Sequence, residues 1–164
     1  MTPKNLLKAL VLAVLTVNSS VAFSNNSHTP ENLIKRDSTM KIQHYTEVVD
    51  NYIRFLNEKN LEGILSLFAD NGSVEDPVGS KIISGKAGLR EFYSGAVNID
   101  LKLKRTGPVR VAGMEAAFPF QLLMEVNSIP TITDIIDVFR FDEEGKIVQM
   151  RAFWGPVNQR QATE

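Results

Sequence analysis

Residues 131–154 have the sequence TITDIIDVFRFDEEGKIVQMRAFW, in which apolar and β-branched residues surround one short polar loop. The loop, Asp142–Gly145, has the composition of a hairpin turn. The flanking segments, Thr131–Phe141 and Lys146–Trp154, are therefore predicted to be antiparallel strands. Glu115–Val126 is another long apolar segment and is predicted to be the strand before them. The C-terminal half of the chain is expected to form a sheet.

The residues before about 100 follow a helical period instead. An amphipathic helix is predicted from apolar residues at helical spacing, namely Val48, Val49, Tyr52, Ile53 and Leu56. A second, short helix is predicted from the cap Asn60 to Phe68, ended by a turn at Asp70–Gly72. A short strand, Ser73–Asp76, and a third helix after Gly85 follow. Helices first and strands afterwards predict an α+β fold, with three helices on one face of a curved, mainly antiparallel sheet. Such curvature creates a conical cavity suited to an apolar ligand.

Length and composition exclude several classes of protein. The chain has 164 residues, of which 43% are hydrophobic and 23% charged, and its formal net charge is −1. This length suits one domain with a sizeable core. The balanced charge gives no electrostatic reason to expect a nucleic-acid partner. The chain has no cysteine and only two histidines, His28 and His44, so neither thiol chemistry nor a histidine-rich metal site is expected.

The N-terminus has the features of a secretory signal peptide. Lys4 precedes a mostly apolar run, Leu6–Val17, and the small residues Ser20 and Ala22 follow it. The run is too short for a stable membrane span. An uncleaved anchor or an amphipathic helix is the alternative. We expect cleavage near Ala22 and export to the periplasm or the medium, which the intact mass of the secreted protein would test.

The sequence divides into three segments on this basis. Residues 1–22 are the predicted signal peptide. Residues 23–39 are polar and without periodicity, and are predicted to be a linker. The folded domain is expected at residues 40–160.

One acidic residue lies inside the most apolar strand. Strand parity places Asp137 on one face with Ile135 and Phe139, and Asp134 on the other face. A carboxyl group in such surroundings must either be paired with a cation or keep its proton. Taken alone, an ion pair with an arginine of the same or the next strand, Arg140 or Arg151, is the more common arrangement.

Two further residues are ordinary when taken singly. Asp76 precedes Pro77, which favours an extended backbone and is typical of a turn. Tyr52 lies on the apolar face of its helix, where a tyrosine usually packs in the core with its hydroxyl hydrogen-bonded. Neither residue defines a site without the other.

Five stretches taken together resemble the bacterial Δ5-3-ketosteroid isomerases, which belong to the nuclear-transport-factor-2-like (SnoaL-like) superfamily. They are VEDPVGS at 74–80, LREFY at 89–93, GPVR at 107–110, IIDVFRFDEEGKI at 135–147 and MRAFW at 150–154. The similarity runs from about Tyr52 to Asn158. It implies a cone-shaped fold, a homodimer formed through an exposed sheet face, and isomerisation of a 3-oxo-Δ5-steroid without a cofactor or metal.

The resemblance also implies a role for particular residues. Asp76 matches the general base, Tyr52 and Asp137 match the two donors to the carbonyl oxygen, and Tyr93 matches a phenol behind Tyr52. Apolar substrate-binding positions are matched by Phe120, Met124, Met150 and Trp154. Moving a double bond into conjugation requires only a base and donors aimed at one developing oxyanion, in agreement with this set.

Some features depart from the family pattern and leave alternatives open. Phe68 stands where some members carry a further tyrosine, and the signal-like N-terminus lies outside the pattern. One alternative is an exported, non-catalytic binding protein for an apolar ligand. Another is a related enzyme for a different enolisable or epoxide substrate; an epoxide hydrolase of this fold would need an Asp-Arg-Asp set, for which the sequence suggests no arginine.

Overall fold

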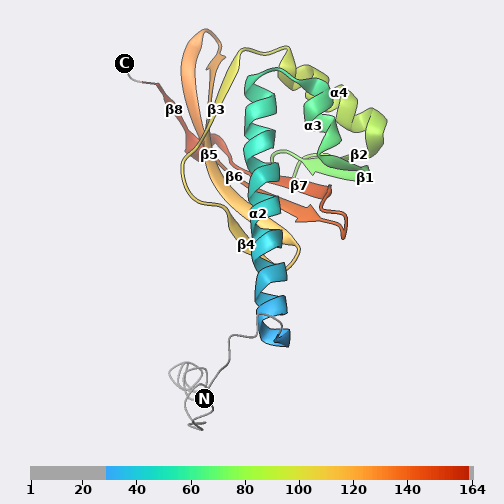
Figure 1. The fold of residues 1–164 in the computed structure, drawn as a ribbon. Helices are drawn as coiled ribbons and strands as arrows, with labels where there is room; N and C mark the ends of the chain where they lie inside the picture. The colour runs from blue at the N-terminus through green and yellow to red at the C-terminus, as the bar shows by residue number, and fades with distance from the viewer. Residues whose placement is uncertain (1–28, 163–164) are drawn as a thin grey trace, which may run out of the picture. The chain divides into compact units, whose positions relative to one another are not determined.

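The computed structural model describes residues 29–162 (Figure 1). The predicted signal peptide and residues 23–28 of the predicted linker lie outside the described residues. The chain divides into two units, Met1–Lys35 and Arg36–Glu164, and the fold described below is that of the second. Within residues 29–162, no helix is both long enough and apolar enough to cross a membrane.

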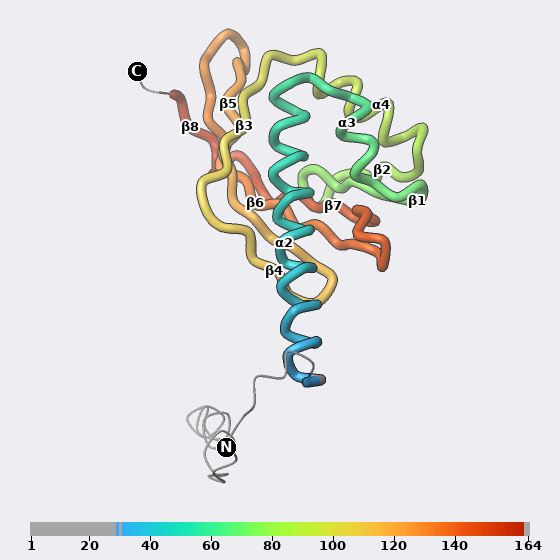
Figure 2. Tube along the Cα trace, in the orientation of Figure 1, coloured from blue at the N-terminus to red at the C-terminus, as the bar shows by residue number. Residues whose placement is uncertain are grey.

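Among residues 29–162, three α-helices precede most of the sheet, as the helical periodicity predicts (Figures 1 and 2). They are α2 (Pro30–Asn57), α3 (Leu61–Ser66) and α4 (Gly85–Val97). From residue 45 onward α2 buries the predicted apolar face, since Val49 and Tyr52 are almost completely inaccessible to solvent. Asn60 caps α3 by accepting a hydrogen bond from the backbone N–H of Gly63 at 2.9 Å.

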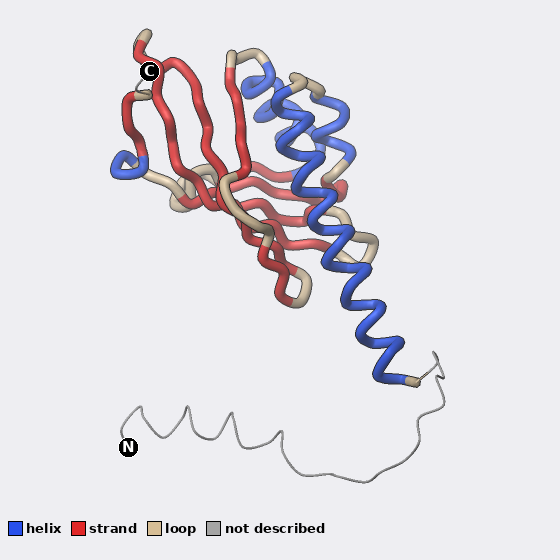
Figure 3. Tube along the Cα trace, turned by 60° about the vertical axis from the view of Figure 1, so that its left-hand side comes forward, coloured by secondary structure: helices blue, strands red, loops and turns tan. Residues whose placement is uncertain are grey.

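The sheet is curved, and the helices lie on one side of it (Figure 3). Its strands are β1 (Phe68–Glu75), β2 (Ile83–Ser84), β3 (Leu101–Arg105), β4 (Arg110–Ala112), β5 (Glu115–Val126), β6 (Ile129–Phe141), β7 (Ile147–Phe153) and β8 (Gln159–Gln161). The order is β2-β1-β7-β6-β5-β3, with β4 beside β5 and β8 beside β6. Only the β1–β7 pair is parallel among the described strands. The predicted α+β fold is confirmed.

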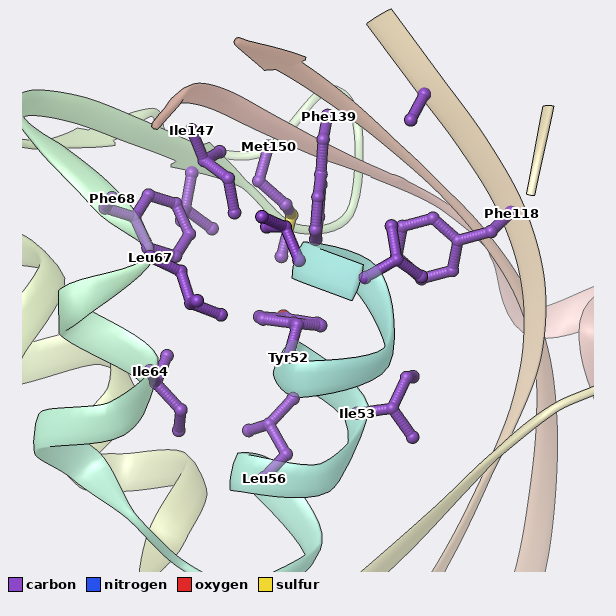
Figure 4. Close-up of a cluster of buried hydrophobic side chains, with 14 of the residues drawn as sticks. Tyr52, Ile53, Leu56, Ile64, Leu67, Phe68, Phe118, Phe139, Ile147 and Met150 are labelled. Atoms are coloured by element: carbon purple, nitrogen blue, oxygen red, sulfur yellow. The ribbon is translucent and has the colours of Figure 1, made fainter. Parts of the chain in front are cut away.

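The hydrophobic core lies between α2 and the sheet (Figure 4). Tyr52 and Leu56 of α2 lie between Ile64 and Phe68 on one side and Phe118 of β5 on the other. The ring of Tyr52 meets that of Phe139 edge to face, at a centroid distance of 5.1 Å. Because Tyr52 stands within this packed core, its hydroxyl has a fixed position.

The helix α2 begins earlier than the sequence pattern predicts. Residues 30–39, assigned to an unstructured linker, are helical, and the side chains of residues 31–43 are exposed. A helix without a buried face has no apolar stripe, so its sequence shows no helical period. Pro30 as the first helical residue is the remaining signal, because its fixed φ suits that position.

Two strand boundaries also differ from the prediction. Asp70–Gly72 lies within β1 rather than in a turn, and the pairing of β1 with β7 shifts register between Phe68 and Ser73. The polar residues therefore occupy an irregular strand segment. β6 begins at Ile129, because Asn127 and Ser128 adopt positive φ angles of 52° and 63° and close a tight hairpin.

The edge strand β3 is held in place from two sides. On one side β3 pairs with β5, and just after the strand Gly107 passes so close to Pro119 of β5 that an added Cβ would lie 2.8 Å from the proline ring. Asn57 of α2 donates to the carbonyl of Leu103 at 2.9 Å and accepts from its N–H at 2.7 Å. This pair of hydrogen bonds fixes β3 against α2, and the two elements form adjacent walls of a cavity.

Candidate active site

A cavity of about 270 Å³ lies between the helices and the sheet. This volume is near the lower limit of small-molecule pockets, roughly 300–1,000 Å³. Its lining is mostly apolar: Tyr52, Leu56, Asp76, Phe92, Tyr93, Gly95, Ala96, Ile99, Leu101, Leu103, Phe120, Leu122, Met124, Ile135, Asp137 and Ala152. Tyr52, Tyr93, Asp76 and Asp137 are the polar side chains in this set. The structure thus brings the four predicted polar site residues into one apolar cavity.

Asp137 is the most unusual of these residues. Its side chain is 1% exposed, and neither carboxyl oxygen has a hydrogen-bond partner in the described part of the chain. Burial, followed by the nearby charge of Asp76, raises its pKa well above the ordinary value. The alternative of an ion pair with Arg140 or Arg151 is not observed among the described residues. The raised pKa favours the protonated carboxyl, and in that form Asp137 can donate a hydrogen bond into the cavity.

Asp134, three residues earlier, has the opposite environment. It lies on the exposed face of β6, where it accepts from Gln121 Nε2 at 3.0 Å and pairs with Arg160. These hydrogen bonds lower its pKa. The predicted strand parity of Asp134 and Asp137 is thus confirmed, and the pKa values of the two acids shift in opposite directions because they face opposite sides of one sheet.

Tyr52 and Tyr93 form a buried pair of phenols. The hydroxyl of Tyr93 donates to that of Tyr52 at 3.3 Å, which leaves the proton of Tyr52 available to a ligand. Desolvation raises the pKa of both phenols well above the ordinary value. The ring of Phe68 lies 5.5 Å from that of Tyr93, so an apolar ring, not a third hydroxyl, stands behind this pair.

Asp76 directly follows the C-terminal end of β1 and is half-buried. One carboxylate oxygen accepts a hydrogen bond of 2.6 Å from the indole N–H of Trp154. Burial raises the pKa of Asp76, and the hydrogen bond from Trp154 partly opposes that rise. The next loop is anchored by Val78, whose N–H donates to the carbonyl of Ala152 at 2.8 Å. Asp76 is therefore a positioned carboxylate whose basicity exceeds that of an exposed aspartate.

The predicted apolar positions divide into two pairs. Phe120 and Met124 line the cavity, whereas Met150 and Trp154 are not among its lining residues. Met150 is 1% exposed and packs in the core, among buried side chains that include Tyr52 and Leu67. Trp154 contacts Asp76 through its indole nitrogen. Its position therefore suits it to orient Asp76.

The sequence did not identify most of the cavity-lining residues on α4, on β3 and in the loop between them. The residues missed include Phe92, Gly95, Ala96, Ile99, Leu101 and Leu122. The alternation of Leu101 and Leu103 along β3 was a usable signal, since both side chains point to the cavity. The sequence of α4 carried no comparable signal for the cavity, because the direction of this helix relative to the sheet depends on tertiary packing.

Replacing Trp154 by Phe is expected to move the pH dependence of catalysis. The indole N–H stabilises the carboxylate form of Asp76, so its removal should raise the pKa of Asp76. A base acts only when deprotonated, and the rising limb of kcat/KM against pH should therefore shift to higher pH. Phe153→Leu, at the exposed last residue of β7, is the control. An unchanged limb in the Trp154→Phe protein would contradict this assignment.

The curved sheet, the covering helices and the apolar cavity with its buried acid define a protein of the nuclear-transport-factor-2-like class. Residues 49–150 match the SnoaL-like domain family, and the chain belongs to that family. Within residues 29–162, no three or more His, Cys, Asp or Glu side chains are grouped so that they could hold a metal ion.

Individual relatives are enzymes with two kinds of chemistry. A steroid Δ-isomerase of Nocardioides simplex is 36% identical over 93 residues, which are 57% of this chain and 75% of that protein. The epoxide hydrolase LasB of Streptomyces lasalocidi is 28% identical over 114 residues, 66% of this chain but only 40% of that protein. The solved structure of SalBIII, an epoxide hydrolase/cyclase-like enzyme with a role in pyran ring formation in the polyether salinomycin, is 29% identical. It superposes with a TM-score of 0.68 and covers 73% of this chain and 97% of that one. These relatives support an enzymatic role on a small molecule.

Proposed function

We propose that this protein is a cofactor-independent isomerase that moves the C=C bond of a 3-oxo-Δ5-steroid into conjugation with the carbonyl group. The observation that carries the proposal is the carboxyl group of Asp137, which is fully buried, unpartnered and in the same cavity as Asp76. A buried donor without a partner is costly unless a ligand supplies the acceptor. The similarity to the steroid Δ-isomerase points to the same kind of substrate.

In this proposal, Asp76 transfers the proton. Its carboxylate removes a proton from the carbon between the carbonyl and the alkene, and the electrons of that C–H bond form a dienolate. The protonated Asp76 then returns the proton to the carbon two positions further along, which leaves the conjugated enone. The raised pKa of Asp76 favours this cycle, because a stronger base accepts the proton more readily.

Tyr52 and Asp137 stabilise the negative charge that develops on the substrate oxygen. Each can donate one hydrogen bond, since Tyr52 accepts from Tyr93 and Asp137 is held neutral by burial. Donors fixed before the reaction need no reorganisation, and the apolar walls exclude water that would weaken their effect. The test is direct: purified protein should convert a Δ5-3-ketosteroid to the enone faster than buffer does, and a rate equal to that of buffer rejects the proposal.

Replacing Tyr93 by Phe should have a much smaller effect than replacing Tyr52 by Phe. Tyr93 acts through Tyr52, and loss of one neutral hydrogen bond of about 0.5–1.5 kcal/mol lowers kcat by about 2- to 10-fold. Loss of the donor Tyr52 itself should lower kcat by about 10²–10³-fold. Equal losses in the two proteins would mean that Tyr93 also contacts the substrate.

The two alternatives can be separated from this proposal. The epoxide hydrolase relatives suggest epoxide opening as one alternative. The cavity lining, however, contains two aspartates and no arginine, so the Asp-Arg-Asp set is incomplete. A non-catalytic binding protein would bind apolar ligands and show no turnover with or without Asp76. The enone assay therefore decides between an isomerase and a carrier.

Export and homodimerisation are part of the proposal. The signal-like segment of residues 1–22 supports export, which the intact mass of secreted protein tests. The outer face of the sheet carries the exposed residues Leu123, Ile136 and Phe153, and Ile136 pairs directly with Phe153. This apolar area supports a dimer formed through the sheet, which sedimentation of the mature protein tests.

A further inference from the structure

The wall of the cavity formed by α4 contains a gap. Phe92, Gly95 and Ala96 lie on one face of the helix, and Ile99 continues that face just beyond its end. Phe92 and Ile99 are large, whereas the two residues between them are the smallest that a helix can carry. The gap is at the outer part of the cavity, because Gly95 and Ile99 are exposed whereas Asp137 is 1% exposed.

The packing around Gly95 gives no reason for glycine at this position. A Cβ added there would meet no atom within 4 Å, and the φ angle of Gly95 is not positive. Glycine inside a helix is less favourable than alanine, because it loses more backbone entropy on folding. The position is thus less stable than it could be, and its effect is to leave space beside the cavity.

The buried end of the same cavity carries the carboxyl group of Asp137. Neither of its oxygens has a partner among residues 29–162, so a ligand oxygen at this end would satisfy the acid. The cavity volume of about 270 Å³ is small, and a ligand of several fused rings that reaches Asp137 must also fill the outer part. The outer lining, which includes Ile99, Leu101 and Met124, offers this part of the ligand neither charge nor hydrogen-bond donor.

We propose that Gly95 determines the size of the substrate, by leaving room at the mouth of the cavity for the uncharged, apolar end that does not react. This inference rests on the proposed function, since it assumes that the reacting carbonyl lies beside Tyr52 and Asp137. A large side chain at position 95 would close the gap between Phe92 and Ile99. Short substrates would still reach the acid, and long ones would not.

Gly95→Leu tests the proposal with two phenols, because a phenol oxygen can occupy the place of the substrate oxygen. Binding of a two-ring naphthol and of a four-ring phenolic steroid is measured by calorimetry. We expect the affinity for the steroid to fall by about 10-fold or more and the affinity for the naphthol to remain unchanged. Gly95→Ala should show the same preference to a smaller extent.

Glu91→Leu provides the matched control, since it introduces the same residue on the exposed side of α4 and outside the cavity lining. It should leave both affinities unchanged. Equal losses for the two phenols in Gly95→Leu, or no loss for either, would overturn the inference about Gly95. Absence of enone formation by the wild-type protein would instead reject the isomerase proposal, and the comparison of the two phenols would still decide the role of Gly95.

Discussion

Replacing Asp76 by Asn is expected to lower the rate of enone formation by about 10²–10⁴-fold, the usual contribution of a positioned general base. The amide has nearly the size of the carboxylate, and its oxygen can still accept the indole hydrogen bond from Trp154. It cannot, however, accept the substrate proton. The rate is followed through the ultraviolet absorbance of the conjugated product.

The preceding residue supplies a control for this substitution. Glu75 is also acidic, but it accepts the N–H of Gly79 at 2.8 Å and does not line the cavity. Glu75→Gln should therefore keep the wild-type rate. A wild-type rate in Asp76→Asn would show that another group is the base. If the wild-type protein and Asp76→Asn both bind naphthol and neither forms enone, the non-catalytic binding protein is favoured instead.

Replacing Asp137 by Asn should lower kcat by about 10²–10³-fold, as expected for the loss of one donor to an oxyanion. An amide N–H can still donate, but it is a weaker donor than a carboxylic acid and its geometry differs. The same enone assay measures this effect. Asp134→Asn is the control, because Asp134 lies on the other face of β6 and should not affect turnover.

The same substitution should change how stability depends on pH. In the unfolded chain Asp137 ionises near pH 3.9, whereas burial raises its pKa in the folded protein. Between these two pKa values the folded protein binds one proton more than the unfolded chain, so this contribution to stability falls by about 1.4 kcal/mol per pH unit. It is fully present below the unfolded pKa and is lost as the pH rises toward the folded pKa.

Denaturant unfolding at several pH values above about 4 measures this effect. The free energy of unfolding of Asp137→Asn, relative to that of the wild type, should increase steadily with pH. Burying the amide adds a cost that is the same at every pH, so it does not affect this trend. A difference that does not vary with pH would show that Asp137 is ionised in the folded protein. The result is independent of any assumption about substrate.

The sequence was most informative where local periodicity determines the direction of a side chain. Alternation along β6 separated Asp137 from Asp134, and the apolar neighbours of Asp137 indicated that it must be either paired or neutral. The choice between a paired and a neutral carboxyl depends on which residues lie on the neighbouring strands. The pairing of β6 with β5 and β7 places Phe118 and Ala152 opposite Asp137. Those neighbours offer it no cation.

Other features depended on tertiary packing. The N-terminal part of α2 has no buried face, so no sequence pattern marked it as helical. Trp154 resembled an apolar binding position, yet the parallel pairing of β1 with β7 brings its indole to Asp76, 78 residues earlier in the chain. Such a contact between distant residues leaves no trace in local spacing, and the same holds for the gap at Gly95.

Trp154 is the single tryptophan of the chain. Because its indole N–H donates a hydrogen bond to the proposed base, the tryptophan fluorescence of the protein originates beside Asp76. Protonation of Asp76 changes the charge next to the excited indole, and a bound ligand changes the polarity around it. The emission should therefore report both the ionisation of the base and the occupancy of the cavity, without any attached label.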